Sequence, residues 1–218
     1  QYNPGTQPFL KVNRNGERFA NESSPYNDIV YAAAHQPGRV YAQICDANIL
    51  EDAKRFHTIG CSAQTRNAGA EYIQKQMDNA EKEGVFFKAD TIEELADKLG
   101  LPKETFTATV DHYNELAAKG EDEDYGKENY RLSTLSEAPF YGVRQAGGYL
   151  ICTIDGIQID DNMHAIDQDF KAIPGLYVIG DMSGNYFSGS YPSLMAGAAA
   201  GRSATFGRLA GQNAAAGI

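Results

Sequence analysis

The sequence contains no tryptophan, only three cysteines and no long apolar run. The last absence excludes a membrane-spanning α-helix, since such a helix needs about 20 consecutive apolar residues. Cys45, Cys61 and Cys152 are widely spaced and form no CxxC pair, so we expect buried, reduced thiols rather than a disulfide framework. The four histidines are scattered as well, without the spacing of a metal site.

Positive charge is also scarce: 19 Lys and Arg stand against 29 Asp and Glu, for a net charge of −10. Nucleic-acid binding needs clustered Lys and Arg, so the composition argues against it. No signal peptide is recognisable. The chain opens with QYNPGTQPFLKVNRNGERF and no Met, which we interpret as the interior of a longer protein, and the compartment stays open.

What the sequence does have is an apolar fraction of 42%, with 13 Tyr and 10 Phe. Its 218 residues suffice for one large domain or two small ones with a real core. Apolar residues on both sides of Asn13-Arg-Asn-Gly16 predict a hairpin, because Asn-Gly tolerates positive φ. Asp28 is placed to cap a short helix that runs to about Ala34. The apolar run 40–45 predicts a buried strand.

Three helices are predicted between residues 68 and 119. The first covers 68–84 and ends at a glycine, and the second covers 90–99 with an acidic first turn and Gly100 as its stop. The third begins at Pro102 and runs to about Lys119, with one apolar face. The acidic run that follows, 120–124, is interpreted as a solvated loop.

The C-terminal third changes character. Short apolar segments at 149–154, 156–159 and 164–166 predict strands. The continuous run 176–179 between Pro-Gly and Gly-Asp is typical of a strand buried on both faces in a parallel sheet. Ligands of such sheets lie beyond the strand ends, so Asp181 is a candidate acceptor for ribityl or ribose hydroxyls. A helix or turn cap is an equally valid interpretation of Asp181.

A glycine-rich loop then leads into a long helix, predicted from Pro192 to Ala210. Its first half, Ala196-Gly-Ala-Ala-Ala-Gly201, is unusually small, and each glycine inside a helix costs about 1 kcal/mol relative to alanine. Either tight packing on a sheet or a flat cofactor at the helix start explains these glycines. The residues alone leave both explanations open.

Three segments in the right order resemble the fumarate reductase and succinate dehydrogenase flavoprotein superfamily. IPGLYVIGD…TFGRLAG resembles its C-terminal flavin-binding signature, and KVNRNGERFANE resembles the hairpin of its substrate-capping domain. TIEELADKLGLPKETFTATVDHYNELAAKGEDEDYGK resembles that domain's helical pair and glycine–acid turn. The resemblance implies an α+β capping domain over residues 1–152. It further implies an α/β segment over 153–218 that completes an FAD-binding domain.

The family's GxGxxG phosphate loop is absent from this sequence. The resemblance therefore implies a partner, the N-terminal Rossmann part of the same protein, and a chain that is inactive by itself. The implied cofactor is FAD. The implied cofactor-binding residues are Gly180, Asp181, Ser193, Leu194, Ala196 and Gly197.

Three charged groups of the family's dicarboxylate reductases have no counterpart here. No Arg follows Asn21-Glu22, and no His precedes Thr153. The position near Leu194 holds no Arg either. Tyr26 and Tyr191 instead resemble the tyrosines of the ketosteroid dehydrogenase branch, which implies catalytic phenols. The implied reaction is hydride transfer between flavin and a C=C or C–C bond activated by a carbonyl, in an enone, enoate or ketosteroid-like substrate.

Three alternatives to this function stay open: a fumarate or urocanate-type reductase, a non-catalytic fragment, and a binding module. A packing role for either tyrosine also stays open, since the chain has 13 Tyr. Arg144 is a candidate for binding a substrate carboxylate or a structural arginine.

Overall fold

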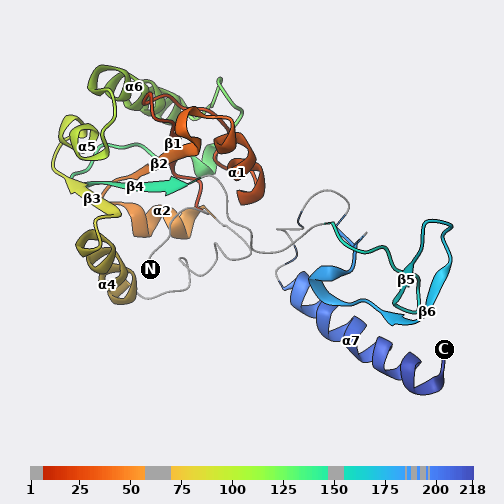
Figure 1. The fold of residues 1–218 in the computed structure, drawn as a ribbon. Coiled ribbons are helices and arrows are strands. Elements are labelled where there is room, and N and C mark those ends of the chain that lie inside the picture. The colour runs from red at the N-terminus through yellow and green to blue at the C-terminus, as the bar shows by residue number, and fades with distance from the viewer. Residues whose placement is uncertain are drawn as a thin grey trace. The chain divides into compact units, whose positions relative to one another are not determined.

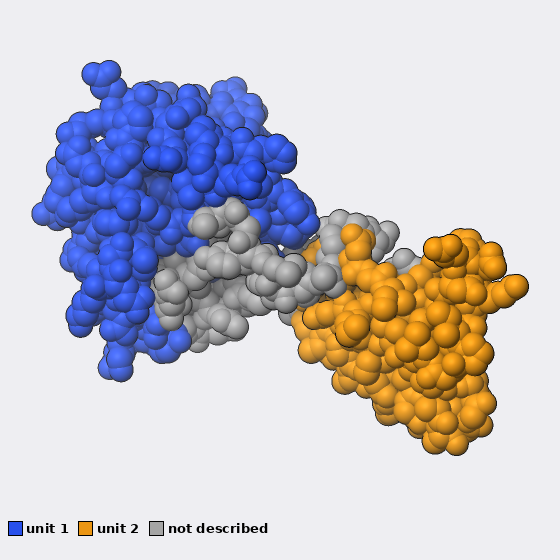
Figure 2. Space-filling view, viewed as in Figure 1, with its two compact units in different colours: residues 1–148 blue, residues 149–218 orange. Residues whose placement is uncertain are grey.

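A computed structural model gives the fold and describes residues 7–56, 70–146, 155–184, 186–187, 191, 195 and 197–218. The chain divides into two compact units, unit 1 (residues 1–148) and unit 2 (residues 149–218), which Figure 2 draws in blue and orange. The predicted boundary between residues 152 and 153 falls in 147–154, outside the described residues. Each unit has its own sheet and helices.

Unit 1 is built on a four-stranded antiparallel sheet in the order β1-β2-β4-β3. Its strands are β1 (Leu10–Val12), β2 (Val40–Cys45), β3 (Phe86–Ala89) and β4 (Phe140–Ala146). The helices that the structure describes in unit 1 are α1 (Tyr26–Ala34), α2 (Ile49–Arg55), α4 (Ala70–Lys82), α5 (Ile92–Leu99) and α6 (Lys103–Lys119). In Figure 1, α5 and α6 lie on one side of this sheet and α2 and α4 on the other.

Strand β2 lies between β1 and β4 and contributes to the core on both faces of the sheet, because successive side chains point to opposite faces. Ile44 packs into the cluster that includes Leu95 of α5 and Phe106 of α6. Cys45 packs into the other cluster, which includes Ile73 of α4. The prediction of a buried strand over 40–45 is confirmed.

The Cys45 thiol is 1% exposed and unpaired, as predicted for a reduced core cysteine. Burial raises its pKa well above the ordinary value, and the nearby carboxylates of Asp46 and Asp52 add to the effect. The predictions for Cys61 and Cys152 lie outside the described residues.

The helices were predicted well where capping residues mark their ends. Helix α5 follows Thr91, whose hydroxyl accepts the Glu94 amide at 3.1 Å, and it stops at Gly100 with φ +67°. Helix α6 follows Pro102 and buries its predicted apolar face. Helix α4 ends near Gly84, as expected.

Two predictions in unit 1 need correction. Helix α1 begins at Tyr26, so Asp28 lies within its first turn and does not cap it. The turn at Asn13–Gly16 forms, with the Gly16 amide donating to the Asn13 carbonyl at 3.0 Å. The returning arm pairs with β1 only through a bridge between Val12 and Arg18, and the main partner of β1 is β2.

Unit 2 contains a two-stranded antiparallel sheet and a long helix. Its elements are β5 (His164–Ile166), β6 (Ala172–Tyr177), the 3₁₀ turn η5 (Gly180–Met182) and α7 (Ala198–Ala216). Two backbone segments pair before α7 through a parallel bridge between Ile157 and Ser183: the Ile157 amide donates to the Met182 carbonyl at 2.9 Å, and the Gly184 amide donates to the Ile157 carbonyl at 2.8 Å. A Cβ at Gly156 would lie 2.4 Å from the Met182 oxygen, so this close approach requires glycine there.

The prediction for 176–179 was wrong. The strand that forms, β6, is antiparallel to β5, and it is exposed along most of its length, with Leu176 46% exposed. An apolar run favours burial, but among the described residues of unit 2 the strand paired with β6 is β5 alone. The helix predicted from Pro192 begins at Ala198, because Gly197 adopts a left-handed conformation with φ +83°.

Candidate functional site

The candidate site in unit 2 begins with η5, which holds Gly180 and Asp181. The Arg202 guanidinium on α7 joins this turn to the helix: Nη2 donates to the Gly180 carbonyl at 2.6 Å and to Asp181 Oδ1 at 3.1 Å. The Asp181 side chain is 50% exposed, whereas the Arg202 side chain is 1% exposed. A buried cation thus holds a carboxylate that remains accessible to solvent.

The start of α7 is the second part of the site. Gly197 precedes the helix, no side chain caps it, and its first turn has no acidic residue. A helix start leaves backbone N–H groups without intrahelical partners and bears partial positive charge. Gly201, one turn in, has open space where a Cβ would be.

Gly207 differs from Gly201, since an added Cβ would lie 3.3 Å from Ile179 Cδ1. Close packing therefore explains one glycine of the helix but not the one nearest its start. The packing explanation thus holds for Gly207, whereas ligand contact near Gly201 stays a prediction.

Aromatic side chains surround Arg202. Its guanidinium carbon lies 5.0 Å from the Tyr186 ring centre and 4.8 Å from that of Phe187. The ring of Tyr191, which is partly buried, lies 5.0 Å from that of Phe187. Tyr191 is therefore one aromatic contact away from Arg202, which contacts Gly180 and Asp181.

The other predicted site residues are placed less completely. Ser193, Leu194 and Ala196 lie outside the described residues. Tyr26, the first residue of α1, is partly buried in unit 1. Tyr26 and Tyr191 belong to different units, so the pairing of the two phenols stays a prediction.

Sequence reasoning missed a buried ionic cluster in unit 1, formed by Lys11, Arg18, Glu22, Asp122 and Lys127. Arg18 makes two bonds to Glu22, at 2.8 and 2.9 Å, and two to Asp122, at 2.7 and 2.6 Å. Lys127 Nζ lies 3.3 Å from Glu22 and donates to the Tyr113 hydroxyl at 2.7 Å. The interpretation of 120–124 as a solvated loop is wrong at Asp122, which is 6% exposed because Arg18 binds it.

The cluster shifts the pKa of its members. Burial opposes ionisation of Asp122, but the bonds from Arg18 and the Lys127 amide outweigh it and lower the pKa to about 2. For Lys11, which is 2% exposed, burial dominates over the attraction of Glu22 and lowers the pKa to about 7. The sequence signal for the cluster was only an excess of charges in two distant segments.

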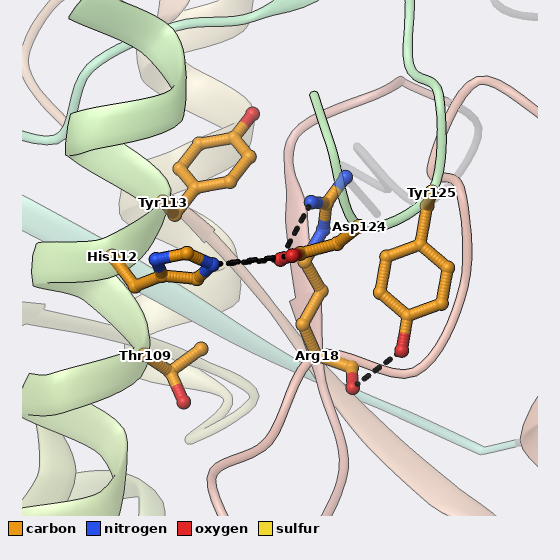
Figure 3. Close-up of a pocket in the computed structure, with 6 residues that line it drawn as sticks. All are labelled: Arg18, Thr109, His112, Tyr113, Asp124 and Tyr125. Atoms are coloured by element: carbon orange, nitrogen blue, oxygen red, sulfur yellow. Dashed lines mark hydrogen bonds and ion pairs between the residues drawn. The ribbon is translucent and has the colours of Figure 1, made fainter. Parts of the chain in front are cut away.

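A pocket of ≈ 420 Å³ lies beside this cluster (Figure 3), lined by Arg18, Thr109, His112, Tyr113, Asp124 and Tyr125. In Figure 3, His112 and Arg18 both point toward Asp124, and His112 Nε2 lies 3.0 Å from Asp124 Oδ2. The Tyr125 hydroxyl donates to the Arg18 carbonyl at 3.2 Å. The polar groups of this pocket bind one another, which is the pattern of a structural network.

Arg144, the other candidate for a substrate carboxylate, donates to the Lys98 carbonyl at 2.9 Å and stacks over Phe87 at 4.7 Å. These contacts are structural ones. In the described part of the chain, no group of His, Cys, Asp and Glu side chains is arranged to hold a metal ion. Over the same residues, no helix combines the length and apolarity needed to cross a membrane.

Comparison with known families matches residues 5–194 to the FAD binding domain family. The chain belongs to this family. FAD is accordingly the family's cofactor, and the resemblance inferred from the three sequence segments is confirmed.

Three curated relatives are reductases, oxidoreductases or dehydrogenases by name. The chain is 32% identical to a vinyl phenol reductase of Lactiplantibacillus plantarum, covering 97% of this chain and 43% of the relative. It is 32% identical to an NADH:acrylate oxidoreductase of Vibrio harveyi (94% and 18% covered) and 34% identical to a 3-oxosteroid 1-dehydrogenase of Mycobacterium tuberculosis (91% and 37% covered). The chain therefore spans less than half the length of each of these relatives.

Two solved structures have similar folds at 25% identity. A 3-ketosteroid delta1-dehydrogenase from Sterolibacterium denitrificans matches with a TM-score of 0.71, covering 99% of this chain and 40% of that one. A flavocytochrome c3 fumarate reductase matches with a TM-score of 0.69, covering 99% of this chain and 34% of that one. The mixed helix and sheet architecture is thus that of FAD-binding flavoproteins.

Proposed function

We propose that the chain forms part of a longer FAD-dependent oxidoreductase. Bound FAD would exchange hydride with a C=C or C–C bond that a neighbouring carbonyl or comparable group activates. The names of the relatives support this class, since vinyl phenol, acrylate and 3-oxosteroids all place such a bond beside an activating group. The alternative of a fumarate-type reductase is less well supported, because this sequence lacks the two arginines and the histidine of the family's dicarboxylate reductases.

The proposed capping domain, residues 1–152, contains unit 1, and the proposed closing segment of the flavin domain, residues 153–218, makes up nearly all of unit 2. The proposed partner is the dinucleotide-binding part of the same protein. The surface of unit 2 supports this: Ile173, Leu176 and Ile179 are 38%, 46% and 40% exposed. A strand with this much apolar exposure is suited to be covered by a further layer of the domain.

The residues of unit 2 fit a flavin. The observation that carries the proposal is the half-exposed Asp181 carboxylate, held by Arg202 where η5 meets the first turns of α7. A carboxylate accepts hydrogen bonds from sugar-like hydroxyls, which the ribityl chain and ribose of FAD supply. The helix start offers N–H donors to an electron-rich ring edge, and Gly201 leaves space beside it.

Tyr191 and Tyr26 are the proposed acid–base groups. A phenol has a pKa near 10, so at neutral pH it donates a hydrogen bond or a proton. Tyr191 stays close to the flavin-contact residues through Phe187, whereas Tyr26 would reach the substrate from the cap. The two phenols are proposed to polarise the carbonyl of the substrate and to transfer one proton.

The experiment is to purify the intact protein that contains this chain and to record its flavin spectrum, and then to assay it with several acceptors. The acceptors are an enone, an aromatic acrylate, a ketosteroid and fumarate. We expect bound FAD and turnover with one of the first three. Turnover with fumarate alone would favour the fumarate-reductase alternative, and a colourless, inactive protein would contradict the proposal.

A further inference from the structure

Arg202 is 3% exposed, the lowest exposure among the charged residues described in unit 2, and it holds the Asp181 carboxylate of the proposed flavin site. Its guanidinium makes three contacts with one short turn: Nη2 to the Gly180 carbonyl and Asp181, and Nη1 to the Ser183 carbonyl at 3.4 Å. All three acceptors lie in residues 180–183, and the donor lies on α7. One side chain therefore fixes the turn against the helix.

The surroundings of Arg202 strengthen these bonds. Two aromatic rings, Tyr186 and Phe187, lie against the guanidinium and exclude water from it. Charge-assisted bonds in such surroundings are stronger than those between neutral groups. The Asp181 carboxylate is half-exposed to solvent, whereas the Arg202 guanidinium is buried. Arg202 therefore holds the carboxylate from the inside and leaves its outer side accessible.

One donor of Arg202 is left over. Nε is buried, and it has no hydrogen-bond partner in the part of the chain that the structure describes. Native proteins rarely leave a buried donor unsatisfied. Nη1 and Nη2 both bind residues 180–183, so the contacts described for this guanidinium serve the turn.

We propose that Arg202 is a positioning residue for the flavin, acting through Asp181. It orients the carboxylate and holds the Gly180 and Ser183 carbonyls in place, so that Asp181 presents its acceptor oxygens to a cofactor hydroxyl at fixed geometry. A carboxylate has about four acceptor positions, so the bond from Arg202 is compatible with a further one. This inference rests on the proposed function, because it requires FAD at the site.

The test is a double-mutant cycle on the FAD dissociation constant of the intact protein. Arg202→Lys keeps the charge but has one nitrogen in place of Nη1 and Nη2, so it cannot reproduce the bonds to Ser183, Gly180 and Asp181 together. We expect it to weaken FAD binding at least tenfold, and Asp181→Asn to do the same. If Arg202 acts through Asp181, the double variant binds FAD no more than about threefold more weakly than the weaker single variant.

The matched control is Arg208→Met, which removes an exposed arginine from the same helix. It should leave the dissociation constant and the visible spectrum of bound flavin unchanged, while Arg202→Lys changes both. If Arg202→Lys does not fold, the inference is tested with Asp181→Asn, because the Asp181 side chain is half-exposed and its substitution should leave the fold intact. The FAD affinity and the visible flavin spectrum of that variant are then compared with those of the unmodified protein.

Three outcomes overturn the inference. They are unchanged FAD affinity in folded Arg202→Lys, additive losses in the double variant, and unchanged FAD affinity in Asp181→Asn. A wild-type protein that retains no FAD contradicts the proposed function itself, so the two failures are distinguishable.

Discussion

Arg18 and Asp122 are 104 positions apart in the sequence and form a two-pronged ion pair, with Nη1–Oδ1 at 2.7 Å and Nη2–Oδ2 at 2.6 Å. Each side chain also binds a second group. Arg18 donates to Glu22, and Asp122 accepts from the Lys127 amide at 2.9 Å. The pair therefore fastens the segment after β1 to the loop after α6. Four predictions follow from this cluster and from the proposed site.

Asp122→Asn should destabilise unit 1 by about 1–3 kcal/mol, because Arg18 keeps its bonds to Glu22 but loses its two charge-assisted bonds to Asp122. Urea denaturation followed by circular dichroism measures the loss. Glu123→Gln is the control, since Glu123 lies in the same loop with its side chain 59% exposed and should change stability by less than about 1 kcal/mol. Equal effects of the two substitutions would show that the buried pair is dispensable.

Stability should fall in acid partly because of Asp122. Its pKa is about 2 in the folded state against an ordinary value of 3.8, so the folded state binds the proton more weakly. The contribution is complete above about pH 4 and is lost as the pH falls toward 2. Urea midpoints between pH 5 and pH 2.5 should decline more steeply in the unmodified protein than in Asp122→Asn. Parallel declines would mean that other carboxylates dominate.

Lys11 should make the free energy of unfolding depend on pH in the neutral to alkaline range. Its pKa is about 7 in the folded state and 10.5 ordinarily, so between these values the unfolded chain binds more protons. The free energy of unfolding should therefore rise with pH from 7 to 9.5, by at most about 1.4 kcal/mol per unit. Lys11→Met should flatten this dependence, and Lys88→Met, which removes an exposed strand lysine, should preserve it. A flat profile in the unmodified protein would refute the assignment.

Tyr191→Phe in the intact protein should slow turnover at least about tenfold, the usual contribution of an acid–base group at the low end. The measurement is kcat with saturating substrate, together with the FAD content of the variant. Tyr186→Phe is the matched control, because the Tyr186 ring also contacts that of Phe187, at 4.9 Å between ring centres, but Tyr186 is not a proposed proton donor. Turnover that is unchanged in Tyr191→Phe removes that phenol from the mechanism.

The sequence predicts the elements whose ends are chemically marked. Thr91 and Gly100 bound α5, and Pro102 precedes α6, because caps and stops act within a few residues. Strand β4 was not predicted, since Gly142 and Arg144 interrupt its apolar pattern. Its place depends on β2 and β3 on either side, and these contacts are distant in sequence.

The candidate site was predicted only where short motifs define it. Gly180 and Asp181 lie at the predicted turn, but Arg202 was missed, although an arginine among the small residues at the start of the helix was a visible signal. Asp122 was missed for a different reason. A run of acidic residues predicts solvation unless a buried partner is known, and that partner lies in a distant segment.

Strand β2 gives the protein a chemical reporter of its own opening. The Cys45 thiol reacts as a thiolate, and burial both hides it and raises its pKa, so reagents meet it only when the centre of the sheet separates. The alkylation rate of the peptide that contains Cys45, followed by mass spectrometry, therefore measures how often unit 1 opens under native conditions. Comparing that rate with and without a bound substrate would reveal whether ligands tighten unit 1, with no engineered probe.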